Sequence, residues 1–240
     1  MKKRKILVIT TFLVVLTLSF SGPLMAEETD TEESFLELCS YAPAEKILEA
    51  IEDGAEINKI YENGMTPFLA AAKSNPHRDA LVLLRNKGAN PYYRTENGWT
   101  ALMYATVYNE NPAIIELLTY IGRDIDIQNS KGNTALLLAV DRGRVDAVRI
   151  LLRSGARVNI KNDKGETPLK LLFTNSYRNY DYTILRMIIT RGANLNIRYE
   201  KGRTIIYFAI SQGRNNAIEL LLENGADVNI RDENGITPLQ

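Results

Sequence analysis

The stretch Lys131–Ile160, KGNTALLLAVDRGRVDAVRILLRSGARVNI, decides the fold. It begins with a glycine and a threonine just before a short apolar run. It continues through a turn at RGRV and ends in a second apolar run that stops at Gly155. A threonine before an apolar run is typical of a helix N-cap, and a glycine after such a run is typical of a helix end. The stretch therefore predicts two helices joined by a tight turn.

The same pattern recurs along the chain at nearly regular intervals. The glycine of each Gly-x-Thr motif follows the previous one by 34, 34, 33, 37 and 33 residues. A second glycine always lies 10 residues before the next motif, so the remaining interval varies as 24, 24, 23, 27 and 23 residues. A connector of fixed length thus alternates with a helical segment that tolerates insertion. The motif glycines are Gly64, Gly98, Gly132, Gly165, Gly202 and Gly235, and the second glycines are Gly54, Gly88, Gly122, Gly155, Gly192 and Gly225.

The stretch NDKGETPLKLL, residues 162–172, shows what each motif does locally. Thr167 is expected to cap a helix by accepting hydrogen bonds from backbone N–H groups. Pro168 suits the first helical turn, where its missing N–H costs nothing. Each motif is therefore predicted to be a turn tip followed by the start of a capped helix.

With a period near 33 and motifs such as GETPL and GADVN, the chain resembles the ankyrin repeat. The resemblance covers about residues 33–240. It implies an all-α solenoid of stacked antiparallel helix pairs with hairpin-like connecting loops. The expected units are 33–60, 61–94, 95–128, 129–161, 162–198 and 199–231, followed by a partial unit at 232–240.

The chain departs from the family pattern in three ways. The histidine usual after Thr-Pro-Leu is absent, which we expect to remove a polar brace between units. The fifth unit carries the insertion NSYRNYDY, and the last motif opens a helix just before Gln240, so Leu220, Leu221 and Leu222 are expected to lie uncovered. We therefore expect a fragment of a longer array, or a chain that associates end to end. The residues at the histidine position are Leu69, Met103, Leu137, Lys170 and Tyr207.

The first 26 residues have the order of a secretory signal peptide. The basic stretch KKRK is followed by the apolar run Ile6–Phe20, a Ser-Gly-Pro break and the small residue Ala26. A membrane span needs about 20 apolar residues, so this run is short for one. We expect cleavage after Ala26, or in second place after Ser21, and a short acidic linker at 27–32. The alternative is an uncleaved segment that anchors the chain in a membrane.

A signal of this style favours a bacterial protein that is periplasmic or secreted and meets the membrane only during export. The whole chain carries 29 basic and 29 acidic residues. Removing the four basic residues of the signal leaves 25 against 29, a net charge of −4. A mildly acidic body gives no electrostatic reason to expect nucleic acid or an anionic membrane as partner.

No set of residues in the sequence points to catalysis, a metal or a cofactor. Cys39 is the only cysteine and His77 the only histidine. We expect Cys39 to be a small buried hydrophobe and His77 an exposed turn residue. A Cys39–His77 nucleophile pair would lack an orienting group and an oxyanion-stabilising element. The sequence therefore predicts a protein without enzymatic activity.

The resemblance places binding on the concave surface formed by the turn tips and the first helices. Trp99 is the strongest anchor candidate, because tryptophan and tyrosine dominate binding hot spots. The alternative is that Trp99 folds back on Tyr92 or Tyr93 and serves packing. The tyrosines of the insertion are a second candidate, and a turn that packs on its own unit is their alternative. The expected partner-binding residues are Met65, Trp99, Tyr108, Asn133, Arg142, Glu166, Arg203, Tyr177 and Tyr180.

These features together predict a non-catalytic module or scaffold that binds another protein outside the cytoplasm through its concave surface. The alternative is the binding domain of a larger enzyme or effector whose remaining part lies beyond Gln240. The sequence does not identify the partner, because scattered tip side chains would determine it.

Overall fold

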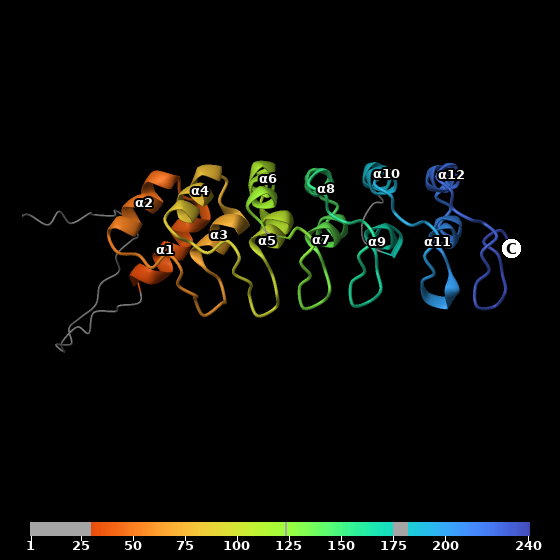
Figure 1. Ribbon diagram of the computed structural model, residues 1–240, viewed down its shortest axis with the longest axis horizontal. Coiled ribbons are helices and arrows are strands. Elements are labelled where there is room, and N and C mark those ends of the chain that lie inside the picture. Colours follow the sequence, from red (N-terminus) through yellow and green to blue (C-terminus); the bar gives the residue numbers. More distant parts are fainter. Residues whose placement is uncertain (1–29, 123, 175–181) are drawn as a thin grey trace, which may run out of the picture.

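The computed structural model describes residues 30–122, 124–174 and 182–240, and within these the side chains from residue 35 onward. The described residues form six antiparallel helix pairs in a row, with no strand among them (Figure 1). This arrangement is the predicted all-α solenoid. The helices are α1 Asp30–Tyr41, α2 Ala44–Glu52, α3 Pro67–Ser74, α4 Arg78–Asn86, α5 Ala101–Tyr108, α6 Pro112–Ile121, α7 Ala135–Asp141, α8 Val145–Arg153, α9 Pro168–Thr174, α10 Tyr182–Thr190, α11 Ile205–Ser211 and α12 Asn215–Glu223, with a 3₁₀ helix η1 at Glu200–Gly202.

The motif threonines begin the first helix of most pairs, as predicted. Thr66, Thr100 and Thr134 each accept a hydrogen bond from the backbone N–H three residues later. Thr167 does the same for the N–H of Lys170 at 3.2 Å. Thr204 differs, because its buried hydroxyl has no hydrogen-bond partner in the described part of the chain. Side-chain capping therefore supports the first helices of units two to five.

The core runs continuously along the array, both inside the pairs and between them. The first helices contact one another in the order α1, α3, α5, α7, α9 and α11, and the second helices form a parallel row (Figure 1). Because a first helix touches both neighbours and its own partner, it is apolar on nearly all sides. Helix α7 is an example, since its residues 135–140 are all buried. Burial of such residues supplies most of the folding free energy.

Polar side chains in the turns within the helix pairs of units two, three, four and six tie each of these units to the one before it. The amide of Asn75 donates to the carbonyls of Cys39 and Ala42, and that of Asn109 donates to those of Ala72 and Asn75. In unit four the guanidinium of Arg144 takes this role, and in unit six that of Arg214. These bonds satisfy helix-end carbonyls that would otherwise be buried without a donor.

Each connector contains a hairpin-like tip, in which a backbone N–H bonds to the carbonyl four residues later. We define the tips as 61–65, 95–99, 129–133, 162–166, 199–203 and 232–236. Some neighbouring tips are joined directly: the N–H of Ser130 bonds to the carbonyl of Asn97 at 3.0 Å, and that of Asp163 to Lys131 at 3.2 Å. Gly132 has a φ of 70°, and a Cβ there would lie 2.6 Å from the Asp163 nitrogen, so this tip requires glycine.

Two of the residues at the missing-histidine position brace neighbouring units after all. Lys170 is buried, and its ammonium pairs with Glu200 and lies 5.2 Å from the centre of the Tyr199 ring. The Tyr207 hydroxyl donates to the carbonyl of Ile230 at 3.1 Å and accepts from the N–H of Asp232 at 3.0 Å. The expected loss of the brace is therefore wrong for units five and six, because other side chains of sufficient length reach the next tip.

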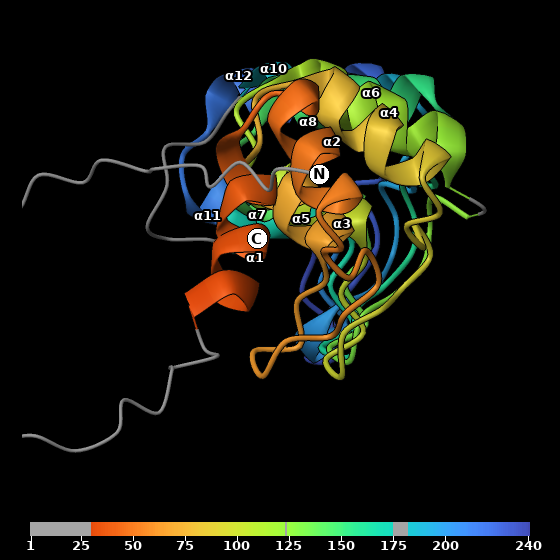
Figure 2. The same ribbon diagram turned by 90° about the vertical axis from the view of Figure 1, so that its left-hand side faces the viewer.

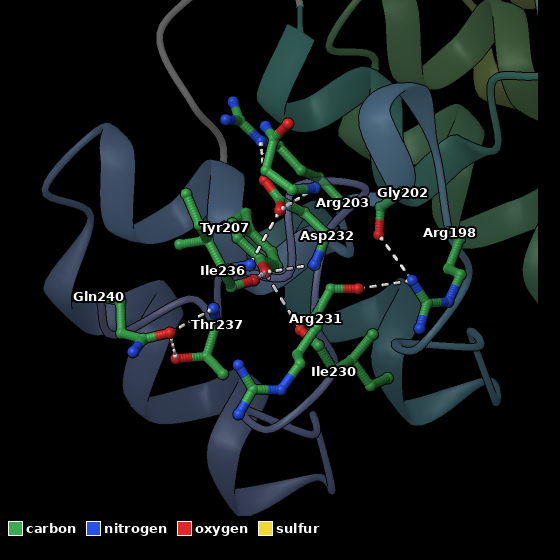
Figure 3. A network of polar contacts seen from close by, with 11 residues as sticks. Arg198, Gly202, Arg203, Tyr207, Ile230, Arg231, Asp232, Ile236, Thr237 and Gln240 are labelled. Atoms are coloured by element: carbon green, nitrogen blue, oxygen red, sulfur yellow. Dashed lines mark hydrogen bonds and ion pairs between the residues drawn. The ribbon is translucent and has the colours of Figure 1, made fainter.

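The last tip, 232–236, is held against unit six by a polar network (Figure 3). The buried carboxylate of Asp232 accepts from the backbone N–H groups of Asn234 and Ile236 and lies 3.4 Å from the guanidinium of Arg203. Arg198 donates to the carbonyl of Arg231 at 2.6 Å. This network orders the residues that follow α12.

The structure differs from two expectations of the sequence analysis. Helix α1 begins at Asp30, inside the segment 27–32 expected to be a linker; further along it Phe35 and Cys39, one turn apart, are buried, and α1 contacts α3. Leu221 is fully buried although it was expected to lie uncovered, since α12 turns it toward α10 and α11, and only Leu222 is substantially exposed. Among the helices described, none is long and apolar enough to cross a membrane; residues 1–26 lie outside them.

Candidate functional site

The tips and the first helices form two walls of one continuous face. Figure 2, which looks along the long axis, shows the tips projecting to one side below the helices. We call this surface the tip face. It corresponds to the concave surface expected from the sequence, and a stack of repeats extends it across many units.

Three aromatic residues gather on this face in unit three, and we call them the aromatic cluster: Trp99, Tyr104 and Tyr108. The ring centre of Trp99 lies 5.0 Å from that of Tyr104 and 6.2 Å from that of Tyr108. The two tyrosines stack at 6.3 Å, because they lie one helical turn apart on α5. Tyr108 is 47% exposed and Trp99 is half-buried. The cluster therefore offers aromatic surface to solvent from a rigid helix.

Local hydrogen bonds hold the cluster in place. The hydroxyl of Thr95 accepts from the backbone N–H of Trp99 at 3.1 Å, which fixes the tip that carries the indole. Burial raises the pKa of Tyr104, against the lowering effect of a hydrogen bond with Thr95. Tyr104 is therefore a neutral phenol at ordinary pH.

Cations already lie over one aromatic ring of the cluster and over one ring beside it. The ammonium of Lys73, at the end of α3, is 5.2 Å from the ring centre of Tyr108. That of Lys59 is 5.5 Å from the ring centre of Tyr61. Aromatic faces attract cations at such distances. This part of the tip face thus has the chemistry to bind positively charged groups.

Two hollows on the tip face have the volume of a binding site. One, of about 330 Å³, lies between the tips 61–65 and 95–99 and reaches Trp99 and Tyr104. The other, of about 480 Å³, lies between the tips 129–133 and 162–166 above α7 and α9. A third hollow, beside the end of α6, has only about 100 Å³. Since ligand pockets usually measure about 300–1,000 Å³, the first two are the candidates.

Only some of the partner-binding residues predicted from the sequence lie together in the structure. Trp99 and Tyr108 come together in the aromatic cluster. Tyr104, which the sequence analysis missed, joins them; its spacing of four residues from Tyr108 on a helix was the available signal. The ring of Trp99 lies against Tyr104 and Tyr108, and its side chain is partly buried against the core, so both the anchor and the packing interpretation of Trp99 stay predictions.

Other predicted residues have structural contacts of their own. Met65 is buried and was expected on the surface; it packs into the core because its tip folds over α3. Arg203 pairs with Asp232, and Arg142 is exposed beside Asp141 at 3.8 Å. Asn133 and Glu166 line the larger hollow, where the amide of Asn162 donates to both. The predicted residues Tyr177 and Tyr180 lie outside the described residues.

The residues with chemical reactivity do not assemble on this face. Cys39 is fully buried in α1, and burial raises the pKa of its thiol to about 12. His77 is exposed just before α4, in the turn where it was expected. Within the described ranges, no group of three or more His, Cys, Asp or Glu side chains is placed to hold a metal.

Comparison with known families agrees with this architecture. A family model of three ankyrin repeats matches residues 36–128 and 106–181, and a model of many ankyrin repeats matches residues 188–240. Together these matches include the whole of α2 to α9, α11 and α12, and parts of α1 and α10. Ankyrin repeats generally bind other proteins.

Several curated proteins contain a similar segment. A "Probable serine/threonine-protein kinase" of Dictyostelium discoideum is 34% identical over 174 residues, which are 69% of this chain and 20% of that protein. Neurogenic locus notch homolog protein 1 of Danio rerio is 30% identical over 66% of this chain and 6% of its own length. The human transient receptor potential cation channel subfamily A member 1 is 27% identical over 78% and 18%, respectively. The chain thus spans a fifth or less of these relatives.

Proposed function

Because the chain belongs to the ankyrin repeat family, we propose that it is a non-catalytic module that binds another protein through the tip face. This proposal rests mainly on the aromatic cluster. Partly exposed tryptophan and tyrosine side chains on a rigid scaffold are typical of binding hot spots. Here they border a hollow of about 330 Å³, so a partner side chain has room to pack against them.

The test compares partners captured by the 240-residue chain and by two variants. Trp99→Ala removes the centre of the cluster. Tyr120→Ala is the matched control, because Tyr120 is 86% exposed on α6, away from the tip face. We expect a captured protein to be lost with Trp99→Ala and kept with Tyr120→Ala. Equal capture by both variants, with circular dichroism showing intact helices, would contradict a tip-face site.

Our proposal for localisation is export to the periplasm or beyond, with residues 1–26 removed. It is supported by the basic start, the apolar run and Ala26. The relatives named above are from Dictyostelium, zebrafish and human, so they do not favour the bacterial source that we inferred from the signal. Intact-mass measurement of the mature chain tests the proposal. Retention of Met1–Ala26 in a membrane fraction would favour the anchor instead.

A second candidate is that the chain is the binding region of a larger enzyme or effector. The lengths of the relatives favour it, since the matched segment is at most a fifth of each. Reading the coding sequence past Gln240 tests this candidate. Continuation into a non-repeat domain would support it, and a stop codon there would exclude it.

A further inference from the structure

The row of tips is open between units two and three. At the next two junctions a backbone hydrogen bond joins neighbouring tips, but among the described residues none joins 61–65 to 95–99. A Cβ on Gly98 would lie 3.1 Å from the following tip, whereas a Cβ on Gly64 would meet no atom within 4 Å. The tips 61–65 and 95–99 are therefore separated, and the hollow of about 330 Å³ fills the gap. We call it the junction hollow.

The lining of the junction hollow combines aromatic rings with carboxylates. Trp99, Tyr104 and Tyr93 contribute aromatic surface, and Glu62 and Glu96 contribute the charged groups. No lysine or arginine belongs to its described lining. Both glutamates are exposed at their tips, so their carboxylates can turn toward a bound group. A group that suits this lining is positively charged and has a flat apolar face.

We propose that the junction hollow binds an arginine side chain of a partner protein. A guanidinium is planar, stacks on aromatic faces, and presents a fork of N–H donors to carboxylates. It is more weakly hydrated than an ammonium, so it loses less on entering a partly aromatic site. The Lys59 ammonium lies 5.5 Å from the ring centre of Tyr61, which lines the hollow, so an aromatic ring of this site already attracts a cation within the chain. This assignment rests on the proposed protein-binding function and names the chemistry that the partner must carry.

Trp99 makes the proposal directly measurable, because it is the only tryptophan of the chain. The probe is the blocked peptide acetyl-Gly-Arg-Gly-amide, titrated into the 240-residue chain at low salt while indole emission is recorded. Matched peptides carry citrulline, which keeps the shape without the charge, or lysine. We expect a saturable change with arginine and about tenfold weaker binding of citrulline, as loss of a charge-assisted, ring-stacked contact predicts. Lysine should lie between the two.

Variants place the binding in the hollow. Glu62→Gln with Glu96→Gln should weaken arginine binding to the level of citrulline. Glu110→Gln with Glu116→Gln removes two exposed carboxylates away from the hollow and should leave binding unchanged. Arginine and citrulline binding equally, no saturable change, or an unaffected Glu62/Glu96 variant would each overturn the proposal. If a protein partner is still captured in a Trp99-dependent way, only the arginine assignment fails, whereas loss of both results rejects the proposed function as well.

Discussion

Lys170 is a charged residue at a position where other units bury an apolar one. Leu69, Met103 and Leu137 occupy the equivalent place and are at most 1% exposed. The Lys170 ammonium is desolvated, and its carboxylate partner Glu200 is 64% exposed. Replacing a buried ion pair by an apolar side chain of similar size is often neutral or stabilising. We predict that Lys170→Met changes the free energy of unfolding by less than about 1 kcal/mol, measured by urea denaturation.

Glu200→Gln is the informative comparison for Lys170→Met. It leaves the Lys170 ammonium buried without a carboxylate partner. It should therefore lower the free energy of unfolding more than Lys170→Met does, by about 1–2 kcal/mol, because water reaches the exposed position 200 and compensates in part. The opposite order, with Lys170→Met the more damaging change, would mean that the pair stabilises the junction of units five and six more than an apolar contact would.

Protonation of Asp232 at low pH should weaken the ordering of the last tip. Burial raises its pKa, but the backbone N–H groups of Ile236 and Asn234 and the guanidinium of Arg203 outweigh it and hold the pKa below its ordinary 3.8. A hydrogen bond from Lys170 likewise holds the pKa of Glu200 below 4.5. A lowered folded-state pKa contributes stability above the unfolded-state value that is lost as pH falls through the folded-state value. The ordering of the last tip should therefore weaken below about pH 4.

Asp232→Asn should reduce this acid sensitivity while keeping the tip folded at neutral pH. The tips of units four and five already use Asn129 and Asn162 with the same pair of backbone bonds to Oδ1. Hydrogen exchange of the Asn234 and Ile236 amides at pH 7 and about pH 3 measures the effect. Asp227→Asn, an exposed change in the same segment, is the control. Equal acid sensitivity in Asp232→Asn and the wild-type chain would assign the effect to another group.

At the scale of single elements, the tips differ in how closely they approach one another. Gly64 and Gly132 have nearly the same φ, 72° and 70°, so alanine is strained at both. Only at Gly132 would the new Cβ also meet the next tip, 2.6 Å from the Asp163 nitrogen. We predict that Gly64→Ala costs about 1–2 kcal/mol and that Gly132→Ala costs clearly more, by thermal unfolding. Equal costs would mean that the tips separate without penalty.

At the scale of the whole molecule, the sequence predicted the features that every unit repeats. The helix pairs, the threonine caps and the tip glycines follow from spacing, because every unit must bury its apolar face against the next. The burial of Met65 and Leu221, the braces at Lys170 and Tyr207, and the junction hollow were not predictable. They depend on the contacts between two particular neighbouring units. An alignment of the units shows only the average unit and does not predict such contacts. The candidate site therefore lies where the contacts between neighbouring units differ from those of the average unit.

Two leucines of the described residues after the start of α12 are exposed, and they offer a test of self-association. Leu222 is 45% exposed, and Leu239 is 74% exposed. Exposed leucine side chains add apolar area to a surface on which molecules could associate. We predict a mass that rises with concentration in light scattering, and a lower mass for Leu222→Glu with Leu239→Glu at the same concentration. Tyr120→Glu, an exposed aromatic change on the side of α6, is the control and should associate like the wild type. A monomer at every concentration, or equal association in the double variant, would show that this end does not join molecules.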